Sequence, residues 1–131
     1  EGRIQARLRH PNVLPVSDVL DLHGHPALLM DFVDGGSLAE RLLGGPMGPE
    51  EALHLARGVI RGVHHAHAAR VLHRDLKPAN VLLDQRDATD PIPRVTDFGL
   101  ARVLGDSNPG LTRMGAMLGT PAYMAPEMLL V

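Results

Sequence analysis

A stretch of polar side chains, residues 73–80, lies between two short apolar runs, 71–72 and 81–83. The apolar runs predict brief strands that enter and leave the stretch, so that a polar loop is held at both ends by buried backbone. Within this loop, Asp75, Lys77 and Asn80 place a carboxylate, an ammonium group and a carboxamide close together in sequence. Lys77 is the one lysine among 13 Lys and Arg residues, which indicates a position that requires a compact point charge rather than a flat guanidinium.

The composition narrows the classes of protein to which the chain can belong. Its 131 residues suit one modest domain or a part of a larger one, and with 44% apolar but only 2% aromatic residues the core should be aliphatic. A net charge of −2 gives no overall attraction to nucleic acid or to a membrane surface. The lack of cysteine excludes disulfides and thiolate metal sites, and the sequence contains neither a signal peptide nor an apolar run long enough to span a bilayer. We therefore expect a cytoplasmic segment.

The first third of the chain predicts a helix end followed by a β-hairpin. Residues 1–9 carry apolar side chains at helical spacing, and Pro11 ends this amphipathic helix. The runs 13–22 and 26–33 favour strands and are separated by a gap centred on Gly24, which is typical of a hairpin turn.

Two further helices are predicted. Ser37 is a good N-cap with Glu40 three residues later, as in a capping box, and a short helix should cover 38–43. Pro49 and two acidic residues then suit the first turn of a longer helix. Its buried stripe is predicted to contain the apolar residues at helical spacing, Ala52, Leu55, Ala56, Val59, Ile60, Val63 and Ala66.

The histidines raise the alternative of a metal site. His23 and His25 flank the predicted hairpin turn, and His64 and His67 can share one helix face. No cysteine or acidic partner stands near the second pair, so we favour solvated turn residues and structural helix residues over a histidine-rich metal protein.

Two motifs follow the polar loop and complete a recognisable order. His73-Arg74-Asp75 with Lys77 and Asn80 comes first, Asp97-Phe98-Gly99 second, and Gly119-Thr120-Pro121 leads into Ala125-Pro126-Glu127. In this order the motifs resemble those of the protein kinase family, with its catalytic loop, metal-binding triplet and activation-segment end. The closing phrase is most similar to the bacterial eukaryotic-like serine/threonine kinases.

The resemblance implies a fold and a division of the chain. It covers essentially all 131 residues but only the middle of the family's domain. We expect an α+β fold that is part of the bilobal kinase fold: the end of the αC helix and two N-lobe strands in 1–30, the hinge in 31–36, and the mainly helical first half of the C-lobe, with the catalytic loop and activation segment, in 37–131. A chain truncated in this way should be marginally stable, because apolar surface of both lobes is left uncovered.

The resemblance also implies roles in phosphoryl transfer from ATP. Asp75 would accept the proton of the acceptor hydroxyl, and Lys77 would neutralise phosphate oxygens. Asn80 and Asp97 offer hard oxygen ligands for Mg²⁺, and the Thr120 hydroxyl would meet the catalytic Asp and Lys. Lys77-Pro78 and Thr120 both follow the serine/threonine pattern, so the expected partners are proteins with Ser or Thr acceptors.

The remaining implied contacts concern the nucleotide. Glu1 stands where the αC glutamate pairs with the lysine that orients ATP. Met30 corresponds to the gatekeeper, backbone groups of Asp31 and Val33 to the adenine contacts, and Leu82 to the floor under adenine. Lys77, Asn80 and Asp97 would complete the ATP and Mg²⁺ site.

A regulatory site is implied as well. Arg74 and Arg102 correspond to a pair that grips a phosphorylated activation-loop residue, and Thr112 is the hypothesised phosphosite, with Ser107 the weaker candidate. The alternative to an enzyme is a catalytically inactive kinase-like fragment that acts as a binding or regulatory module.

Overall fold

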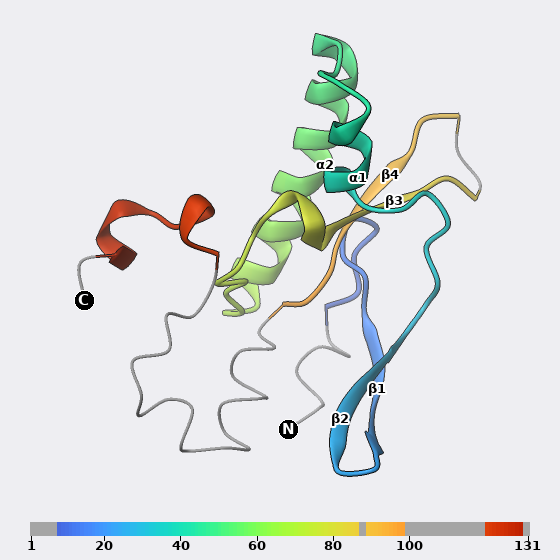
Figure 1. Ribbon diagram of the computed structural model, residues 1–131, viewed down its shortest axis with the longest axis vertical. Coiled ribbons are helices and arrows are strands. Elements are labelled where there is room, and N and C mark those ends of the chain that lie inside the picture. The colour runs from blue at the N-terminus through green and yellow to red at the C-terminus, as the bar shows by residue number, and fades with distance from the viewer. Residues whose placement is uncertain (1–7, 87–88, 99–119, 130–131) are drawn as a thin grey trace.

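The computed structural model describes residues 8–86, 89–98 and 120–129, which form small sheets and helices, as predicted (Figure 1). In chain order the elements are strands β1 (Val16–Leu22) and β2 (His25–Met30), helices α1 (Leu38–Leu43) and α2 (Pro49–Ala68), the 3₁₀ turn η2 (Pro78–Asn80), strands β3 (Val81–Asp84) and β4 (Ile92–Val95), and the 3₁₀ turns η3 (Pro121–Tyr123) and η4 (Pro126–Leu129). Strands β1 and β2 form one antiparallel pair and β3 and β4 another. In the described part of the chain, no helix is long and apolar enough to cross a membrane.

The β1–β2 hairpin confirms the turn that was predicted around Gly24. The two turn residues, His23 and Gly24, have φ of 57° and 83°, and Leu22 pairs with His25 across the turn. Positive φ at both central residues matches the right-handed twist of the flanking strands. The Asp21 carboxylate accepts a hydrogen bond of 2.6 Å from the Gly24 N–H, which holds the turn closed.

Helix α1 has the predicted bounds and the predicted cap. The Ser37 hydroxyl accepts from the Glu40 N–H at 3.2 Å, and Glu40 accepts from the Ser37 N–H at 2.6 Å, so the capping box is complete. Arg41 then forms a two-pronged ion pair with Glu51, at 2.8 and 2.9 Å, which fixes α1 beside the start of α2.

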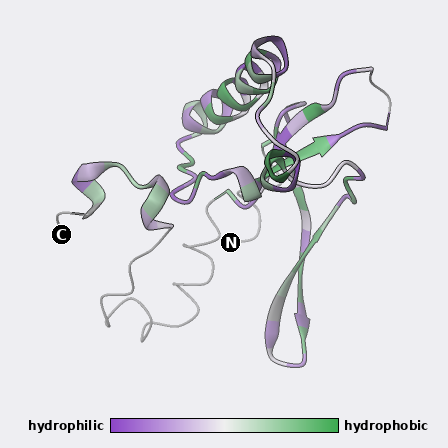
Figure 2. Ribbon diagram, turned by 45° about the horizontal axis from the view of Figure 1, so that its top comes forward, coloured by the Kyte–Doolittle hydropathy of each residue, from purple (hydrophilic) through white to green (hydrophobic). Residues whose placement is uncertain are grey.

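Helix α2 is amphipathic, and the predicted stripe is confirmed in part: Leu55 and Ala66 are buried, and Val59 and Val63 are partly buried and packed against the core. Hydrophobic and hydrophilic residues alternate in bands along it (Figure 2), yet Ala56 is exposed and Ile60 is 65% exposed. The buried positions are Leu55, Gly58, Gly62 and Ala66. The prediction that Ala56 and Ile60 are buried was wrong because it counted only apolar side chains, whereas the Pro93 ring packs against Gly58 and the Asn12 backbone packs against Gly62.

The two glycines let α2 approach the rest of the fold closely. A Cβ at Gly58 would collide with the Pro93 ring, and a Cβ at Gly62 would collide with the carbonyl of Asn12. Asn12 is itself tied to β4, because its side-chain amide donates to the Pro93 carbonyl at 2.9 Å. The helix therefore rests directly on β4 and on the loop that precedes β1.

The core gathers around Val95, the last residue of β4. Val95 is completely buried in a cluster with Leu8, Val13, Ala66 and Phe98. Its N–H donates to the Asn12 carbonyl and its carbonyl accepts from the Leu14 N–H, both at 2.9 Å. Residues 12–14 thus run along β4 as an added edge. The core is aliphatic as expected, apart from Phe98.

The strand predicted for residues 71–72 is not formed. Helix α2 ends instead in a Schellman motif: the N–H of Arg70, whose φ is 59°, donates to His67, and the N–H of Val71 donates to Ala66, each at 2.9 Å. The backbone of Val71 is therefore used to close the helix. The second predicted strand is present as β3, so the polar loop is held by a helix end on one side and a strand on the other.

A buried histidine joins this core to the polar loop. The His73 ring packs on Phe98, with 4.8 Å between ring centroids, and its Nε2 lies 2.8 Å from the Thr96 carbonyl. A carbonyl only accepts, so Nε2 carries the proton. Nδ1 then accepts from the Asp75 N–H at 3.3 Å. The second contact requires an unprotonated Nδ1 and therefore the neutral ring, and burial lowers the pKa of His73 below its ordinary value of 6.5, although the bond to Thr96 opposes that shift.

The close approach at Gly62 leads to a stability prediction. Gly62→Ala should lower the free energy of unfolding by about 1–2 kcal/mol, because the clash with Asn12 outweighs the better helix propensity of alanine, which is worth about 1 kcal/mol. Urea denaturation followed by circular dichroism measures this. Ala56→Gly, at an exposed position inside the same helix, is the control that measures the difference in helix propensity alone. A gain in stability for Gly62→Ala that equals the loss for Ala56→Gly would contradict the packing account.

The neutral state of His73 leads to a pH prediction. The unfolded histidine binds a proton near pH 6.5 whereas the folded one binds it only at lower pH, so stability should fall as the pH is lowered through about 6.5. The measurement is the free energy of unfolding against pH for the wild type and for His73→Gln. The variant should lose stability at neutral pH and show a shallower decline on acidification. Parallel curves for the two proteins would refute the assignment of the neutral ring.

Candidate active site

Asp75, Lys77 and Thr120 form a closed triangle of polar contacts. The Lys77 Nζ lies 2.6 Å from Asp75 Oδ2 and 2.8 Å from Thr120 Oγ1. Asp75 Oδ1 accepts from both the N–H and the hydroxyl of Thr120, at 2.8 and 2.9 Å. The hydrogen bond from Lys77, and then those from Thr120, hold the pKa of the Asp75 carboxyl below its ordinary value, so the group is an anion at neutral pH.

The loop backbone presents this carboxylate through unusual local geometry. Arg74 has a φ of 69°, in the left-handed region that residues other than glycine rarely adopt. The Asn80 amide donates to the Asp75 carbonyl at 2.8 Å, and the Asp75 N–H donates to His73 as described. The main chain of Asp75 is thus held from both sides, which fixes the direction of its side chain.

Asn80 and Asp97 stand at the same end of the β3–β4 pair. Val81 and Val95 are opposite each other, and one step further the Thr96 N–H donates to the Asn80 carbonyl at 3.0 Å. Asp97 follows with a φ of 65°, and the Thr96 hydroxyl reaches its carboxylate at 3.4 Å. Because the Asn80 NH₂ is engaged with the loop, its carboxamide oxygen is the atom left for a cation. Asn80 and Asp97 together offer hard oxygen atoms, the ligands that Mg²⁺ prefers.

Strand β2 and the segment that follows it also approach this end of the β3–β4 pair. The Thr96 hydroxyl oxygen also lies 3.7 Å from the Met30 sulfur, which places the end of β2 next to the residue before Asp97. Val33 is buried and Asp31 exposed. The segment that follows runs beside β3, where Leu82 is partly buried and the Leu83 N–H donates to the Gly36 carbonyl at 2.9 Å.

Several predicted site residues lie outside the described residues. These are Glu1, Arg102, Thr112, Ser107 and the glycine of the Asp97-Phe98-Gly99 triplet. Arg74, the remaining member of the predicted phosphate-gripping pair, is exposed.

The histidines give no support to the alternative of a metal centre. Among the residues that the structure describes, no group of three or more His, Cys, Asp or Glu side chains is placed to hold a metal ion. At the end of α2, His65 instead stacks on His10, with 5.0 Å between ring centroids.

Thr96 is the residue of this site that sequence reasoning overlooked. Its carbonyl fixes His73, its N–H bonds to Asn80, and its hydroxyl reaches both Met30 and Asp97. The available signal was its place between the apolar Val95 and the acidic Asp97, where a strand ends and a polar side chain is needed.

Comparisons with known proteins identify relatives along nearly the whole chain. The family model described as "Protein kinase domain" matches residues 1–130. Serine/threonine-protein kinase PkaA of Streptomyces coelicolor is 46% identical over 97% of this chain, and PknJ of Mycobacterium tuberculosis is 40% identical over 98%. The DNA damage-responsive serine/threonine-protein kinase RqkA of Deinococcus radiodurans is 44% identical over 97%.

The matched region is a small part of each relative. This chain spans 23% of PkaA, 22% of PknJ and 19% of RqkA. All three relatives are bacterial, in agreement with the branch that the motifs predicted. The family match covers nearly the whole chain and includes the loop that carries Asp75, Lys77 and Asn80. The chain therefore belongs to the protein kinase domain family.

Proposed function

We propose that this chain supplies the catalytic centre of a serine/threonine protein kinase that transfers a phosphoryl group from ATP to hydroxyl groups of proteins. The observation that carries the proposal is the triangle of Asp75, Lys77 and Thr120, in which one ionised carboxylate contacts an ammonium group and an aliphatic hydroxyl within 2.9 Å. The names of the related kinases, which are serine/threonine enzymes, support the class of acceptor. The division into N-lobe, hinge and C-lobe at residues 1–30, 31–36 and 37–131 is part of the same proposal.

Asp75 is the residue that would receive the acceptor hydroxyl. A carboxylate has about four lone-pair positions. Thr120 occupies the two on Oδ1, and Lys77 occupies one on Oδ2. The remaining position on Oδ2 is next to the Lys77 ammonium, so a hydroxyl bound there would be oriented by the carboxylate, which could hold its proton, and would lie beside a positive charge.

Lys77 would stabilise negative charge where the phosphoryl group moves. Its ammonium has three N–H donors, of which two point to Asp75 and Thr120. The third is available for a phosphate oxygen. Bound MgATP supplies the phosphoryl group, and its transfer depends on positioning and electrostatic stabilisation more than on covalent help.

The oxygen atoms of Asn80 and Asp97 would hold Mg²⁺. The donor set fits the ion, because carboxylate and carboxamide oxygens stand at one end of the β3–β4 pair. Met30, the backbone of Asp31 and Val33, and Leu82 would surround the adenine. Glu1, Arg74, Arg102 and Thr112 retain their proposed roles in orienting ATP and in regulation.

Replacement of the base tests this function. Asp75→Asn in the full-length protein should lower the rate of labelled phosphate transfer from ATP to a Ser- or Thr-containing protein by about 10²–10⁴-fold, because the amide cannot take a proton. Affinity for ATP should change little. Asp18→Asn is the matched control, an exposed position on β1 away from the loop. Equal transfer by wild type and Asp75→Asn would reject Asp75 as the base, and no transfer by the wild type would favour the inactive binding module.

A further inference from the structure

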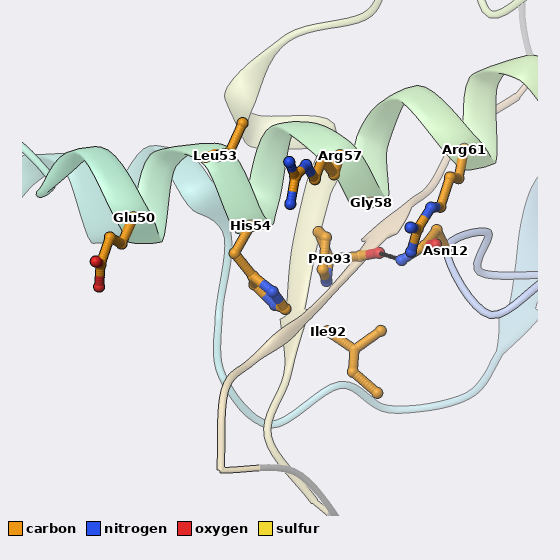
Figure 3. Close-up of a pocket in the computed structure, with 9 residues that line it drawn as sticks. All are labelled: Asn12, Glu50, Leu53, His54, Arg57, Gly58, Arg61, Ile92 and Pro93. Carbon is orange, nitrogen blue, oxygen red and sulfur yellow. Dashed lines mark hydrogen bonds between the residues drawn. The ribbon is translucent and has the colours of Figure 1, made fainter.

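A cavity of about 500 Å³ lies between α2 and β4, formed by residues that take no part in the triangle of Asp75, Lys77 and Thr120 (Figure 3). The helix contributes one continuous stripe of side chains to it, and the other wall comes from β4 and Asn12. The stripe consists of Glu50, Leu53, His54, Arg57 and Arg61.

The floor of the cavity is apolar and firmly built. Gly58 is buried against the Pro93 ring, so helix and strand meet there without an intervening side chain. Ile92 extends this floor, and the Asn12 amide holds Pro93 in place through its carbonyl. The floor therefore offers a preformed surface for an aliphatic side chain.

The rim of the cavity is strongly charged at one end. Arg57 and Arg61 are one helical turn apart, both are exposed, and Figure 3 shows Arg61 extending from α2 toward Asn12. Other arginines, such as Arg41 and Arg94, are paired with carboxylates. Within the described ranges, neither Arg57 nor Arg61 forms an ion pair.

The opposite end of the cavity carries Glu50, so the charge of the rim changes from negative to positive along α2. Arg61 lies eleven positions after Glu50 in the helix, a rise of about 16 Å. An extended peptide covers that length with about five residues. A segment that places acidic groups at the arginine end and avoids them at the glutamate end would match this charge distribution.

Such a segment cannot bind by adding a strand to β4. Pro93 has no N–H to donate, and its carbonyl already accepts from Asn12. The neighbouring Pro91 carbonyl is occupied by His54, whose Nε2 donates to it at 3.0 Å. Recognition at this edge must come from side chains instead of backbone pairing.

We propose that this cavity is a docking site for an extended protein segment that sets an aliphatic side chain on the floor of Pro93 and Ile92 and a neighbouring Asp or Glu against Arg57 and Arg61. The aliphatic group removes apolar surface from water, and the two guanidinium groups supply geometric preference for a carboxylate. The site is separate from the phosphoryl-transfer residues, so the proposal does not depend on catalytic activity.

Peptide selection against the full-length protein tests the docking site. A displayed library of random peptides, selected on the wild type, should be enriched in Asp or Glu beside Leu, Ile or Val. The enriched peptides should bind Arg57→Glu about tenfold more weakly. Arg9→Glu, an exposed position outside the cavity with the same change in charge, should bind them as the wild type does.

A charge exchange makes the test specific to the contact. An enriched peptide whose acidic residue is replaced by Lys should bind Arg57→Glu more tightly than it binds the wild type, because the two reversals compensate. The proposal is overturned if no peptides with acidic and aliphatic residues are enriched, or if Arg57→Glu and Arg9→Glu weaken binding equally. It is also overturned if the losses of binding free energy caused by Arg57→Glu and by the Lys replacement in the peptide add together instead of compensating.

Discussion

The backbone of Val95 is the constraint on which the rest of this structure depends. This residue is completely buried, pairs with Val81 in β3, and exchanges hydrogen bonds with Asn12 and Leu14 on its other side. Three segments that are distant in sequence are therefore joined at one point. Beyond that point the same ladder continues through Asn80 and Thr96, and the chain then turns out at Asp97. The two proposed metal ligands are neighbours because the strands behind them are paired.

Protonation states follow from the same arrangement. His73 is buried between Phe98 and Thr96 and stays neutral, so its two nitrogen atoms connect β4 to the polar loop. Asp75, in contrast, is partly exposed and is stabilised as an anion by Lys77 and Thr120. One loop thus contains a neutral ring that orients the main chain and a charged carboxylate that contacts Lys77 and Thr120. The difference in charge follows from burial, because the buried ring is neutral whereas the partly exposed carboxylate is ionised.

The local features were predictable from the sequence. The hairpin at Gly24, the capping box at Ser37 and the bounds of α1 all depend on residues within a few positions of one another. The errors arose where distant segments decide the outcome. Ile60 is apolar but exposed, and Gly62 is buried because the carbonyl of Asn12 lies against it. No periodic pattern in α2 contains that information.

The candidate site shows the same division between local and distant information. Asp75, Lys77 and Asn80 are visible as a motif, whereas the contact of Asp75 with Thr120, 45 residues later, was expected only from the family resemblance. The position of Thr96 before Asp97 was a signal in the sequence, but its bonds to His73 and Asn80, and the cavity beside α2, depend on contacts between distant segments. Motifs in the sequence identify candidate residues, whereas the pairing of distant strands determines which of these residues lie close together.

We propose that Lys77 acts as a compact charge shared by Asp75 and Thr120, and its replacement by arginine is the sharpest test of this role. A guanidinium in Lys77→Arg would grip both oxygens of Asp75 and displace the hydroxyls that share them. Labelled phosphate transfer from ATP by the full-length Lys77→Arg protein should fall by about 10²-fold or more, with the fold intact by circular dichroism. Transfer at the wild-type rate would show that charge alone is sufficient and would contradict the account.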